Sequence, residues 1–205
     1  MPGHMLCRLI DAAAAVARQH AAQLDEVDRA LGDADHGSNL LGGIRALEAA
    51  RERLSLLPLG AALRLAGRIV SERMPGAGRF YGVLLEEMGG CAPDGQVTTG
   101  DLVRMVEAGV AGVRRAGAAA PGQKTMLDVL CPVADALRIA HDAGDDHLLG
   151  TRALAAAAAG LHRTSRCLAT KGRAAARREE SLGHLDPGAC SCALMIGAVI
   201  ATLEQ

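Results

Sequence analysis

The chain has 205 residues, of which half are hydrophobic, and a formal net charge of −1; this length fits one domain with a sizeable core, expected to span residues 1–205. The balanced charge gives no electrostatic basis for partnership with nucleic acid or with an anionic membrane surface. No apolar run reaches the roughly 18 residues of a membrane-spanning helix, no signal peptide is recognisable, and the six cysteines lack disulfide-type spacing, so we expect a cytoplasmic protein with reduced thiols.

Helices account for the whole predicted fold. The chain has one Tyr, one Phe and no Trp, so the core must consist of Leu, Val, Ile, Met and Ala. Alanine is the strongest helix former, and residues 12–15 and 155–159 are alanine throughout. No stretch shows a convincing strand pattern. The composition therefore predicts an all-α protein in which small side chains allow close helix packing.

Breaks at Gly, Pro and Asp divide the chain into eight predicted helices. They cover about residues 5–24, 38–54, 59–71, 79–89, 100–117, 124–142, 145–170 and 189–204. The aspartates from residue 28 onward are expected to end the first helix, and Thr99 is expected to cap the fifth. Pro132 should kink the sixth. The last helix is apolar nearly all round and is predicted to be buried.

The segment 171–188 is dense in charge and glycine, and it is long for a loop in a compact protein. Loops of this length are often lids or binding elements. Its basic residues precede an Asp-Pro-Gly sequence at 186–188. We interpret the segment as a candidate binding loop, with a solvated surface loop as the alternative.

The most informative stretch is 28-DRALGDADHGSNL-40, which holds three aspartates within eight positions. On a helix, Asp28 and Asp33 would lie about 140° apart, so the carboxylates of Asp28, Asp33 and Asp35 converge only if the helix has ended and the chain turns. Gly32 and Gly37 would permit that turn. Converging carboxylates repel one another, and a bound cation removes the repulsion. The stretch therefore predicts a site with oxygen ligands, suited to Mg²⁺, Mn²⁺ or Ca²⁺.

The spacing within this stretch excludes an EF-hand, since counting from Asp33 places Gly37 and Ile44 at positions where that loop needs ligands. Mg²⁺ usually completes its shell with water and substrate phosphates. The residues that follow, His36, Gly37, Ser38 and Asn39, could donate hydrogen bonds to a phosphate at a helix N-terminus. These features favour a magnesium–nucleotide site, and the alternative is a solvated acidic turn that caps the next helix.

Two further stretches could join this site besides the basic segment 171–188, and a cysteine pair is a separate candidate for zinc. Residues 74–78, Met-Pro-Gly-Ala-Gly, open a helix and could bring backbone N–H groups to an anion, although a plain turn is the simpler interpretation. Residues 117–126 resemble a Walker A loop only superficially, because Gln123 interrupts the motif and no strand precedes it. Cys190 and Cys192 lie near His184, but no second ligand pair has matching spacing, so we interpret both as small apolar residues rather than zinc ligands.

Taken together, these motifs resemble the family of L subunits of dihydroxyacetone kinase. The resemblance rests on D-x-x-x-G-D-A-D-H-G-x-N at 28–39, G-x-K-T-M-x-D at 122–128, K-G-R-A at 171–174 and S-x-G-H-x-D-P-G-A-x-S at 181–191. It covers nearly the whole chain. It implies an up-and-down barrel of about eight antiparallel helices with the nucleotide at one end, in agreement with the eight helices counted from the sequence.

The resemblance also implies roles for individual residues. Asp28, Asp33 and Asp35 would hold two Mg²⁺ ions that bridge the phosphates of ADP or ATP. The other nucleotide-contacting positions would be His36, Gly37, Ser38, Asn39, Gly76, Ala77, Gly117, Met126, Arg173, Asp186, Pro187 and Gly188. Arg173 and 186–188 would belong to a loop that closes over the nucleotide. No residue of this chain is expected to act as a general base, because the acceptor hydroxyl would be activated on a partner.

The implied partner is a separate K subunit that binds dihydroxyacetone, while the L subunit presents the phosphoryl group. In phosphotransferase-system versions a phosphohistidine M subunit rephosphorylates bound ADP, and in ATP-dependent versions ATP exchanges. A homodimer is one further assembly compatible with the sequence. The implied activity is thus phosphoryl transfer by one subunit of a multi-subunit kinase, assisted by Mg²⁺.

Two departures from the family pattern bear on this expectation. The loop that usually reads G-G-x-S-G is 74-MPGAG-78 here, so Ala77 replaces a serine hydroxyl expected on a phosphate, and Arg79 would offer a compensating charge. Gln123 replaces the usual aspartate beside Lys124, and Asp128 is expected to form a surface pair with that lysine. The altered loop keeps open a second function, a nucleotide-sensing regulatory module that binds ADP or ATP without turnover, and it allows another small ketose as acceptor.

Overall fold

The computed structural model describes residues 2–205, and within that range it contains nine α-helices, three short 3₁₀ helices and no strand. The α-helices are α1 (Pro2–Arg29), α2 (His36–Ala49), α3 (Arg51–Ser55), α4 (Leu59–Arg73), α5 (Gly78–Gly90), α6 (Thr99–Gly117), α7 (Leu127–Asp142), α8 (Leu149–Thr164) and α9 (Pro187–Leu203). The 3₁₀ helices are η1 (Asp146–Leu148), η2 (Arg173–Arg177) and η3 (Glu179–Ser181). The all-α prediction is confirmed.

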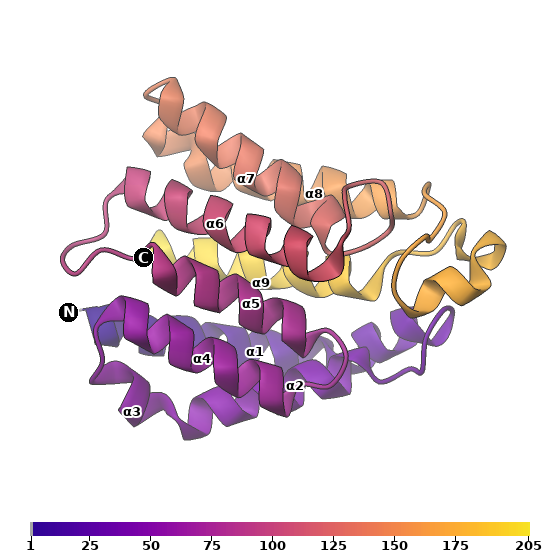
Figure 1. Ribbon diagram of the computed structural model, residues 1–205, viewed down its shortest axis with the longest axis horizontal. Helices are drawn as coiled ribbons and strands as arrows, with labels where there is room; N and C mark the ends of the chain where they lie inside the picture. The colour runs from indigo at the N-terminus through magenta and orange to yellow at the C-terminus, as the bar shows by residue number, and fades with distance from the viewer. Residues whose placement is uncertain (1) are drawn as a thin grey trace.

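Eight of these helices form a closed ring (Figure 1). Each long helix packs against the next one along the chain, and α9 returns to pack against both α8 and α1. The short α3 is an addition between α2 and α4. Successive helices of the ring run in opposite directions (Figure 1). This arrangement confirms the predicted up-and-down barrel of about eight antiparallel helices.

The topology decides which connections meet. Because the helices alternate in direction, every second connection falls at the same end of the barrel. The connections α1–α2, α4–α5, α6–α7 and α8–α9 therefore share the end drawn on the right of Figure 1. These four connections carry the aspartate stretch, the 74–78 loop, the 117–126 loop and the 171–188 segment. The fold thus gathers the four sequence motifs at one end.

Several predicted helix bounds were wrong. The first helix continues to Arg29 instead of ending near residue 24, because residues 25–29 contain no helix breaker. The predicted helix 38–54 is two helices, interrupted at Ala50. The helix expected from 124 begins at Leu127, since Lys124 adopts a left-handed backbone with φ 59°. The helix expected to reach 170 ends at Thr164, whose carbonyl accepts a hydrogen bond from the Lys124 ammonium.

Two further expectations need correction. The cap of α6 is Thr98, not Thr99: its hydroxyl accepts from the Asp101 N–H while the Asp101 carboxylate accepts from the Thr98 N–H, which is a capping box. The expected burial of the last helix holds only for its first half. Each barrel helix keeps an outward face, and α9 leaves Val199 38% and Leu203 44% exposed there.

The core is built as the composition requires, from Leu, Val, Ile, Met and Ala side chains in two clusters. One cluster lies among α6, α7, α8 and α9, and the other among α1, α2 and α4. Helices α4 and α5 approach so closely that a Cβ at Gly67 would lie 2.6 Å from the Gly82 carbonyl oxygen. Among the described helices, none is both long and apolar enough to cross a membrane.

Candidate functional site

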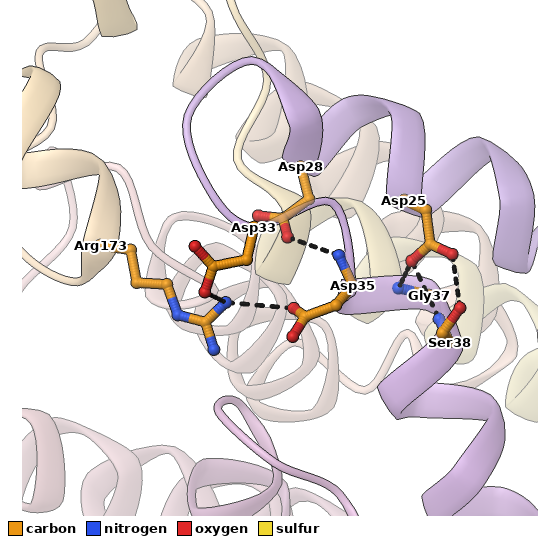
Figure 2. Close-up of polar contacts among 7 residues, drawn as sticks. All are labelled: Asp25, Asp28, Asp33, Asp35, Gly37, Ser38 and Arg173. Atoms are coloured by element: carbon orange, nitrogen blue, oxygen red, sulfur yellow. Dashed lines mark hydrogen bonds and ion pairs between the residues drawn. The ribbon is translucent and has the colours of Figure 1, made fainter.

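The aspartate turn, residues 28–35, begins inside α1 and ends where α2 starts. Asp28 lies in the last turn of α1 and is buried, whereas Asp33 is exposed. The Asp28 carboxylate accepts a hydrogen bond from the Asp35 N–H at 3.2 Å, which closes the turn (Figure 2). Ala34 adopts a left-handed backbone with φ 60°, a conformation that costs a non-glycine residue roughly 1–2 kcal/mol. Strain of this kind concentrates at functional sites.

The glycines of this turn act differently from the prediction. Neither Gly32 nor Gly37 has a positive φ, and the left-handed position belongs to Ala34. A Cβ at Gly32 would clash with the Asp28 carboxylate, and one at Gly37 would clash with the Ala21 carbonyl group. The two glycines are therefore required for close approach: Gly32 lets the turn fold over Asp28, and Gly37 lets α2 pack on α1.

Arg173 supplies the counter-charge to the aspartate turn. Its Nη1 lies 2.8 Å from Asp33 Oδ2 and 3.1 Å from Asp35 Oδ1 (Figure 2). Three carboxylates thus face one guanidinium, which leaves two negative charges in the cluster without a counter-charge among the described residues. Such a surplus attracts a further cation.

Asp25 occupies the N–H groups that begin α2. Its Oδ1 accepts from the N–H groups of Gly37 at 2.7 Å and Ser38 at 3.0 Å, and its Oδ2 accepts from the Ser38 hydroxyl at 2.6 Å (Figure 2). Partial burial raises the pKa of Asp25, but these hydrogen bonds outweigh it and lower the pKa overall. Gly37 and Ser38, predicted to face a phosphate, are therefore already engaged.

The role of Asp25 was missed from the sequence. The available signal was an acidic residue one helical turn before Asp28, placed to face the N-terminus of the following helix. Of the remaining predicted donors, Asn39 is partly buried, and its side-chain amide has no hydrogen bond among the described residues. His36 turns its Nε2 to Ser191 Oγ at 2.8 Å. Burial lowers the pKa of His36, against the opposing effect of the Asp28 and Asp35 carboxylates.

The 74–78 loop reaches the same cluster through Arg173. Gly76 has φ 71°, and a Cβ there would lie 3.1 Å from an Arg173 guanidinium nitrogen. Ala77 stands at the N-cap of α5 without a side-chain cap. Arg79, expected to compensate for Ala77, instead donates to the Ala116 carbonyl at 2.8 Å and stacks over Phe80. Arg173 is thus the cation that lies over this glycine.

Lys124 and Asp128 do not form the predicted surface pair; each is only 1% exposed. The Asp128 carboxylate accepts from the N–H groups of Gly122 at 2.5 Å and Thr125 at 2.8 Å, which folds the loop before α7. The left-handed backbone of Lys124 turns its side chain inward, where it bonds carbonyl oxygens of the α8–α9 connection. The loop is therefore a structural anchor.

Lys124 fastens both ends of the connection that carries Arg173. Its ammonium donates to the carbonyl of Thr164 at 2.5 Å, to that of Cys167 at 3.4 Å, and to that of His184. Between these points, Arg177 donates to the Ala30 carbonyl at 3.3 Å, so the connection also rests on the aspartate turn. The predicted binding loop is thus held at its base and lies over the aspartates.

The Asp-Pro-Gly sequence opens α9. The Asp186 carboxylate caps the helix by accepting from the Ala189 N–H at 2.7 Å, and Pro187 occupies the first turn, where it needs no N–H partner. A Cβ at Gly188 would lie 3.6 Å from the Met126 Cβ, so the start of α9 adjoins the α6–α7 connection. Burial raises the pKa of Asp186 to about 7. This carboxyl group is therefore partly protonated near neutral pH.

Gly117, another position expected to contact the nucleotide, lies at the end of α6 against Phe80. A hollow of about 500 Å³ lies beside it, lined by Ala111, Arg114, Arg115, Ala118, Ala119, Ala120 and Gln123. None of the aspartates lines this hollow. The structure therefore brings together the aspartate turn, Gly76 and Arg173, and separately Met126 and Gly188, but shows no contact between Gly117 and either group.

The cysteines offer no metal site. Cys190 and Cys192 are buried, and burial raises the pKa of both thiols to about 12, so neither provides a thiolate at neutral pH. Across residues 2–205, no three His, Cys, Asp or Glu side chains already converge on one point. The aspartates nonetheless fit Mg²⁺ chemically, since their ligands are carboxylate oxygens with surplus charge. A cation held by the carboxylates of Asp33 and Asp35 would have to displace the Arg173 guanidinium from them.

Comparison with known sequences identifies relatives over most of the chain. The DAK2 domain matches residues 30–201. The ADP-binding subunit DhaL of PEP-dependent dihydroxyacetone kinase 1 from Listeria innocua is 35% identical over 180 residues, which is 87% of this chain and 86% of that subunit. The L-erythrulose 1-kinase of Mycolicibacterium smegmatis is 34% identical over 189 residues, covering 90% of this chain but only 33% of the larger enzyme.

Solved structures show the same fold. The dihydroxyacetone kinase of C. freundii in its native form superimposes with a TM-score of 0.74 and 26% identity, covering 96% of this chain and 34% of that one. The same enzyme in complex with AMP-PNP and Mg²⁺ also gives a TM-score of 0.74, at 24% identity. This chain therefore corresponds to about a third of the solved kinase.

Proposed function

The chain belongs to the DAK2 domain family, and from this premise we propose that residues 1–205 form the magnesium–nucleotide-binding subunit of a kinase for dihydroxyacetone or a related small ketose. Its homology to ADP-binding DhaL subunits covers nearly the full length of those subunits. The observation that carries the proposal is the aspartate turn: Asp28, Asp33 and Asp35 are gathered at the motif-bearing end of the barrel with one counter-cation, Arg173.

We assign Asp28, Asp33 and Asp35 as the residues that would hold two Mg²⁺ ions. When bound, the ions would neutralise charge on the nucleotide phosphates and on the group in transfer. The chain prepares this site in three ways. Gly32 folds the turn onto Asp28, the Asp28 carboxylate fixes the Asp35 backbone, and Asp25 locks the start of α2 in place.

Arg173 would then act on the nucleotide. Its two ion pairs with Asp33 and Asp35 are largely exposed to solvent, and pairs of this kind contribute roughly 0–1 kcal/mol each. A dication competes easily against such weak pairs. The displaced guanidinium remains tethered beside Gly76 by the connection that Lys124 fastens, and its planar donors suit phosphate oxygens. The α8–α9 connection would thereby close over the nucleotide.

Sugar binding is assigned to a separate K-type subunit, and rephosphorylation of ADP to an M-type subunit where the donor is the phosphotransferase system. These partners are implied by the subunit names of the relatives. The erythrulose kinases among the relatives extend the acceptor class to four-carbon ketoses. Since the chain covers about a third of those enzymes, their substrates serve here only as candidates for assay.

A reconstituted reaction tests the proposal. The chain is mixed with a K-type subunit and either ATP or a phosphorylated M-type donor, and dihydroxyacetone, D-erythrulose and L-erythrulose are supplied in turn. We expect a sugar phosphate in the ³¹P NMR spectrum with at least one ketose. Magnesium-dependent ADP binding without product under any combination would instead favour the second function.

That second function is a nucleotide-sensing module that binds ADP or ATP and controls a partner without turnover. The observation that favours it is Ala77, which offers no hydroxyl at the N-cap of α5, where the family loop carries a serine. The Ala77→Ser variant distinguishes the kinase function from the sensor function. Under the kinase proposal it raises nucleotide affinity by up to about tenfold and raises turnover, whereas under the sensor reading it raises affinity without producing any sugar phosphate.

A further inference from the structure

A chain of hydrogen bonds connects the start of α2 with the inside of the barrel. Ser191, on the first turns of α9, is fully buried, and its hydroxyl lies 2.8 Å from His36 Nε2, 2.7 Å from the Tyr81 hydroxyl and 3.1 Å from the Gly188 carbonyl oxygen. Cys192 Sγ lies 3.3 Å from the same Tyr81 hydroxyl. Tyr81 is the only tyrosine of the chain. Of this network, only His36 and Gly188 are among the nucleotide-contacting positions expected from the sequence; Ser191, Tyr81 and Cys192 have no role in the proposed phosphate and metal contacts.

Counting protons assigns a direction to every bond. The Gly188 carbonyl can only accept, so the single Ser191 proton goes to it. Ser191 Oγ must then accept from both of its other partners, which requires Tyr81 to donate its hydroxyl proton and His36 to carry a proton on Nε2. The Tyr81 oxygen in turn accepts the Cys192 S–H. This is the only assignment in which all four contacts are hydrogen bonds.

The other ring nitrogen of His36, Nδ1, has no partner in this network. Nδ1 has no hydrogen-bond partner among the described residues. His36 directly follows Asp35, whose carboxylate contacts Arg173. In the neutral ring with a proton on Nε2, Nδ1 is a bare acceptor.

We propose that Ser191 and Tyr81 are positioning residues that hold His36 in the Nε2–H tautomer, so that it offers the nucleotide site a hydrogen-bond acceptor. A bare nitrogen cannot donate to a phosphate oxygen, which is itself an acceptor. Its partner is a proton-bearing group, either an ordered water at the site or a hydroxyl of the nucleotide. Donors to phosphate must then come from Arg173, Asn39 and the backbone around Gly76.

The tautomer can be measured without any ligand, so its test is independent of the proposed function, on which only the role at the nucleotide rests. Long-range ¹H–¹⁵N correlation spectra of the ¹⁵N-labelled chain separate a bare from a protonated ring nitrogen. A His36→Asn variant identifies the His36 signals among those of the seven histidines. We expect a bare Nδ1 and a protonated Nε2 in the wild type. A proton on Nδ1, in either a neutral or a cationic ring, would overturn the proposal.

Two variants of the same network provide a matched pair. Ser191→Ala removes the acceptor for the Nε2 proton, so a mixture of both tautomers is expected. Tyr81→Phe removes a donor to Ser191 but leaves that acceptor in place, so the wild-type tautomer should persist. Equal spectra for His36 in both variants would contradict the assignment. Should Ser191→Ala not fold, as judged by circular dichroism, the wild-type spectrum and Tyr81→Phe still decide it.

The affinity for ADP tests whether the His36 tautomer matters for nucleotide binding. With ADP and Mg²⁺ in the calorimeter, we expect Ser191→Ala to bind about two- to tenfold more weakly than Tyr81→Phe, as for the loss of one hydrogen bond. If the two variants bind ADP equally while their His36 tautomers are as expected, the tautomer has no role in nucleotide binding. The positioning of His36 by Ser191 and Tyr81 would still stand. Absence of ADP binding in the wild type would refute the proposed function but not the tautomer.

Discussion

The aspartate turn and the loop of Lys124 and Asp128 share residue types but differ in their environments. Both combine glycine with charged residues, and both lie at the same end of the barrel. Lys124 and Asp128 are each 1% exposed, and every charge there is bonded to backbone groups of the chain itself. In the aspartate turn, Asp33 and Asp35 reach solvent, and one guanidinium pairs with two of the three carboxylates.

The difference separates structure from function. A buried charge is tolerated only when the chain satisfies it completely, so the Lys124 loop has no capacity left for a ligand. An exposed cluster with surplus charge costs little in the folded state and keeps its capacity for a cation. Substitutions in the first region should therefore change stability, and those in the second should change binding.

The largest expected effect is that of Lys124→Met on stability. Loss of the ammonium leaves the carbonyls of Thr164, Cys167 and His184 without their donor in a buried site, which should lower the free energy of unfolding by roughly 3–5 kcal/mol. Urea denaturation followed by circular dichroism measures it. Lys171→Met, at the only other lysine, is the control and should change stability by less than about 0.5 kcal/mol. Equal stability of the two variants would contradict the anchoring role of Lys124.

Asp186, which caps α9, should make the stability of the protein depend on pH. Burial raises its pKa from 3.8 to about 7 in the folded protein, so the folded state binds this proton more tightly than the unfolded state. Stability from this group is therefore full below about pH 4 and is lost as the pH rises toward 7, with a slope of at most about 1.4 kcal/mol per pH unit.

The measurement compares urea unfolding of the wild type and of Asp186→Asn between pH 4 and pH 8. Asparagine keeps the cap on α9 but cannot titrate. We expect the difference in stability between wild type and variant to shift in favour of the variant as the pH rises through this window. A difference independent of pH would show that the Asp186 pKa is not raised.

In the aspartate turn, Asp33→Ala should leave stability within about 0.5 kcal/mol but weaken Mn²⁺ binding in the presence of ADP by about ten- to a hundredfold. Electron paramagnetic resonance of free Mn²⁺ measures the affinity. Asp11→Ala, which breaks another exposed 2.8 Å ion pair, with Arg51, is the matched control and should not affect binding. If Asp33→Ala lost stability but kept its Mn²⁺ affinity, the aspartate turn would be a structural element, which would contradict its assignment as a binding site.

The smallest effect concerns Arg173 as the resident counter-cation. Arg173→Met removes its competition at Asp33 and Asp35, so Mn²⁺ affinity without nucleotide should rise about three- to tenfold, more at low ionic strength than at high. ADP affinity should fall in the same variant. Arg177→Met, which removes a bond to a backbone carbonyl, should leave the affinity for the ion alone unchanged. An unchanged ion affinity in Arg173→Met would show that the guanidinium does not compete.

The sequence predicted the helical class and the gathering of four motifs more reliably than the contacts within them. The resemblance to the L-subunit family supplied the up-and-down barrel with the site at one end, and Arg173 does meet the aspartates. The end of α8 at Thr164 was missed because it depends on a contact across the barrel, the bond from Lys124 to the Thr164 carbonyl. The end of α1 at Arg29 was missed although residues 25–29 contain no helix breaker. The burial of Lys124 could not be predicted from the sequence, because a lysine in a loop is normally exposed to solvent.

Within the site, the sequence identified which residue types gather but not which groups remain free. Gly37 and Ser38 were assigned to a phosphate because they follow an acidic turn, yet Asp25 occupies both N–H groups. The inward direction of His36 depends on Ser191, which lies 155 positions away in the chain. Long-range hydrogen bonds of this kind leave no periodic signal in a single sequence.

The most direct measurement is calorimetric titration of the unsubstituted chain with ADP, with and without Mg²⁺. If a cation completes the aspartate turn, ADP should bind saturably in the presence of Mg²⁺. It should bind at least tenfold more weakly when the metal is removed by chelation. ADP binding of equal strength in both titrations, or none in either, would contradict the assignment of Asp28, Asp33 and Asp35 as the metal-holding centre of a nucleotide site.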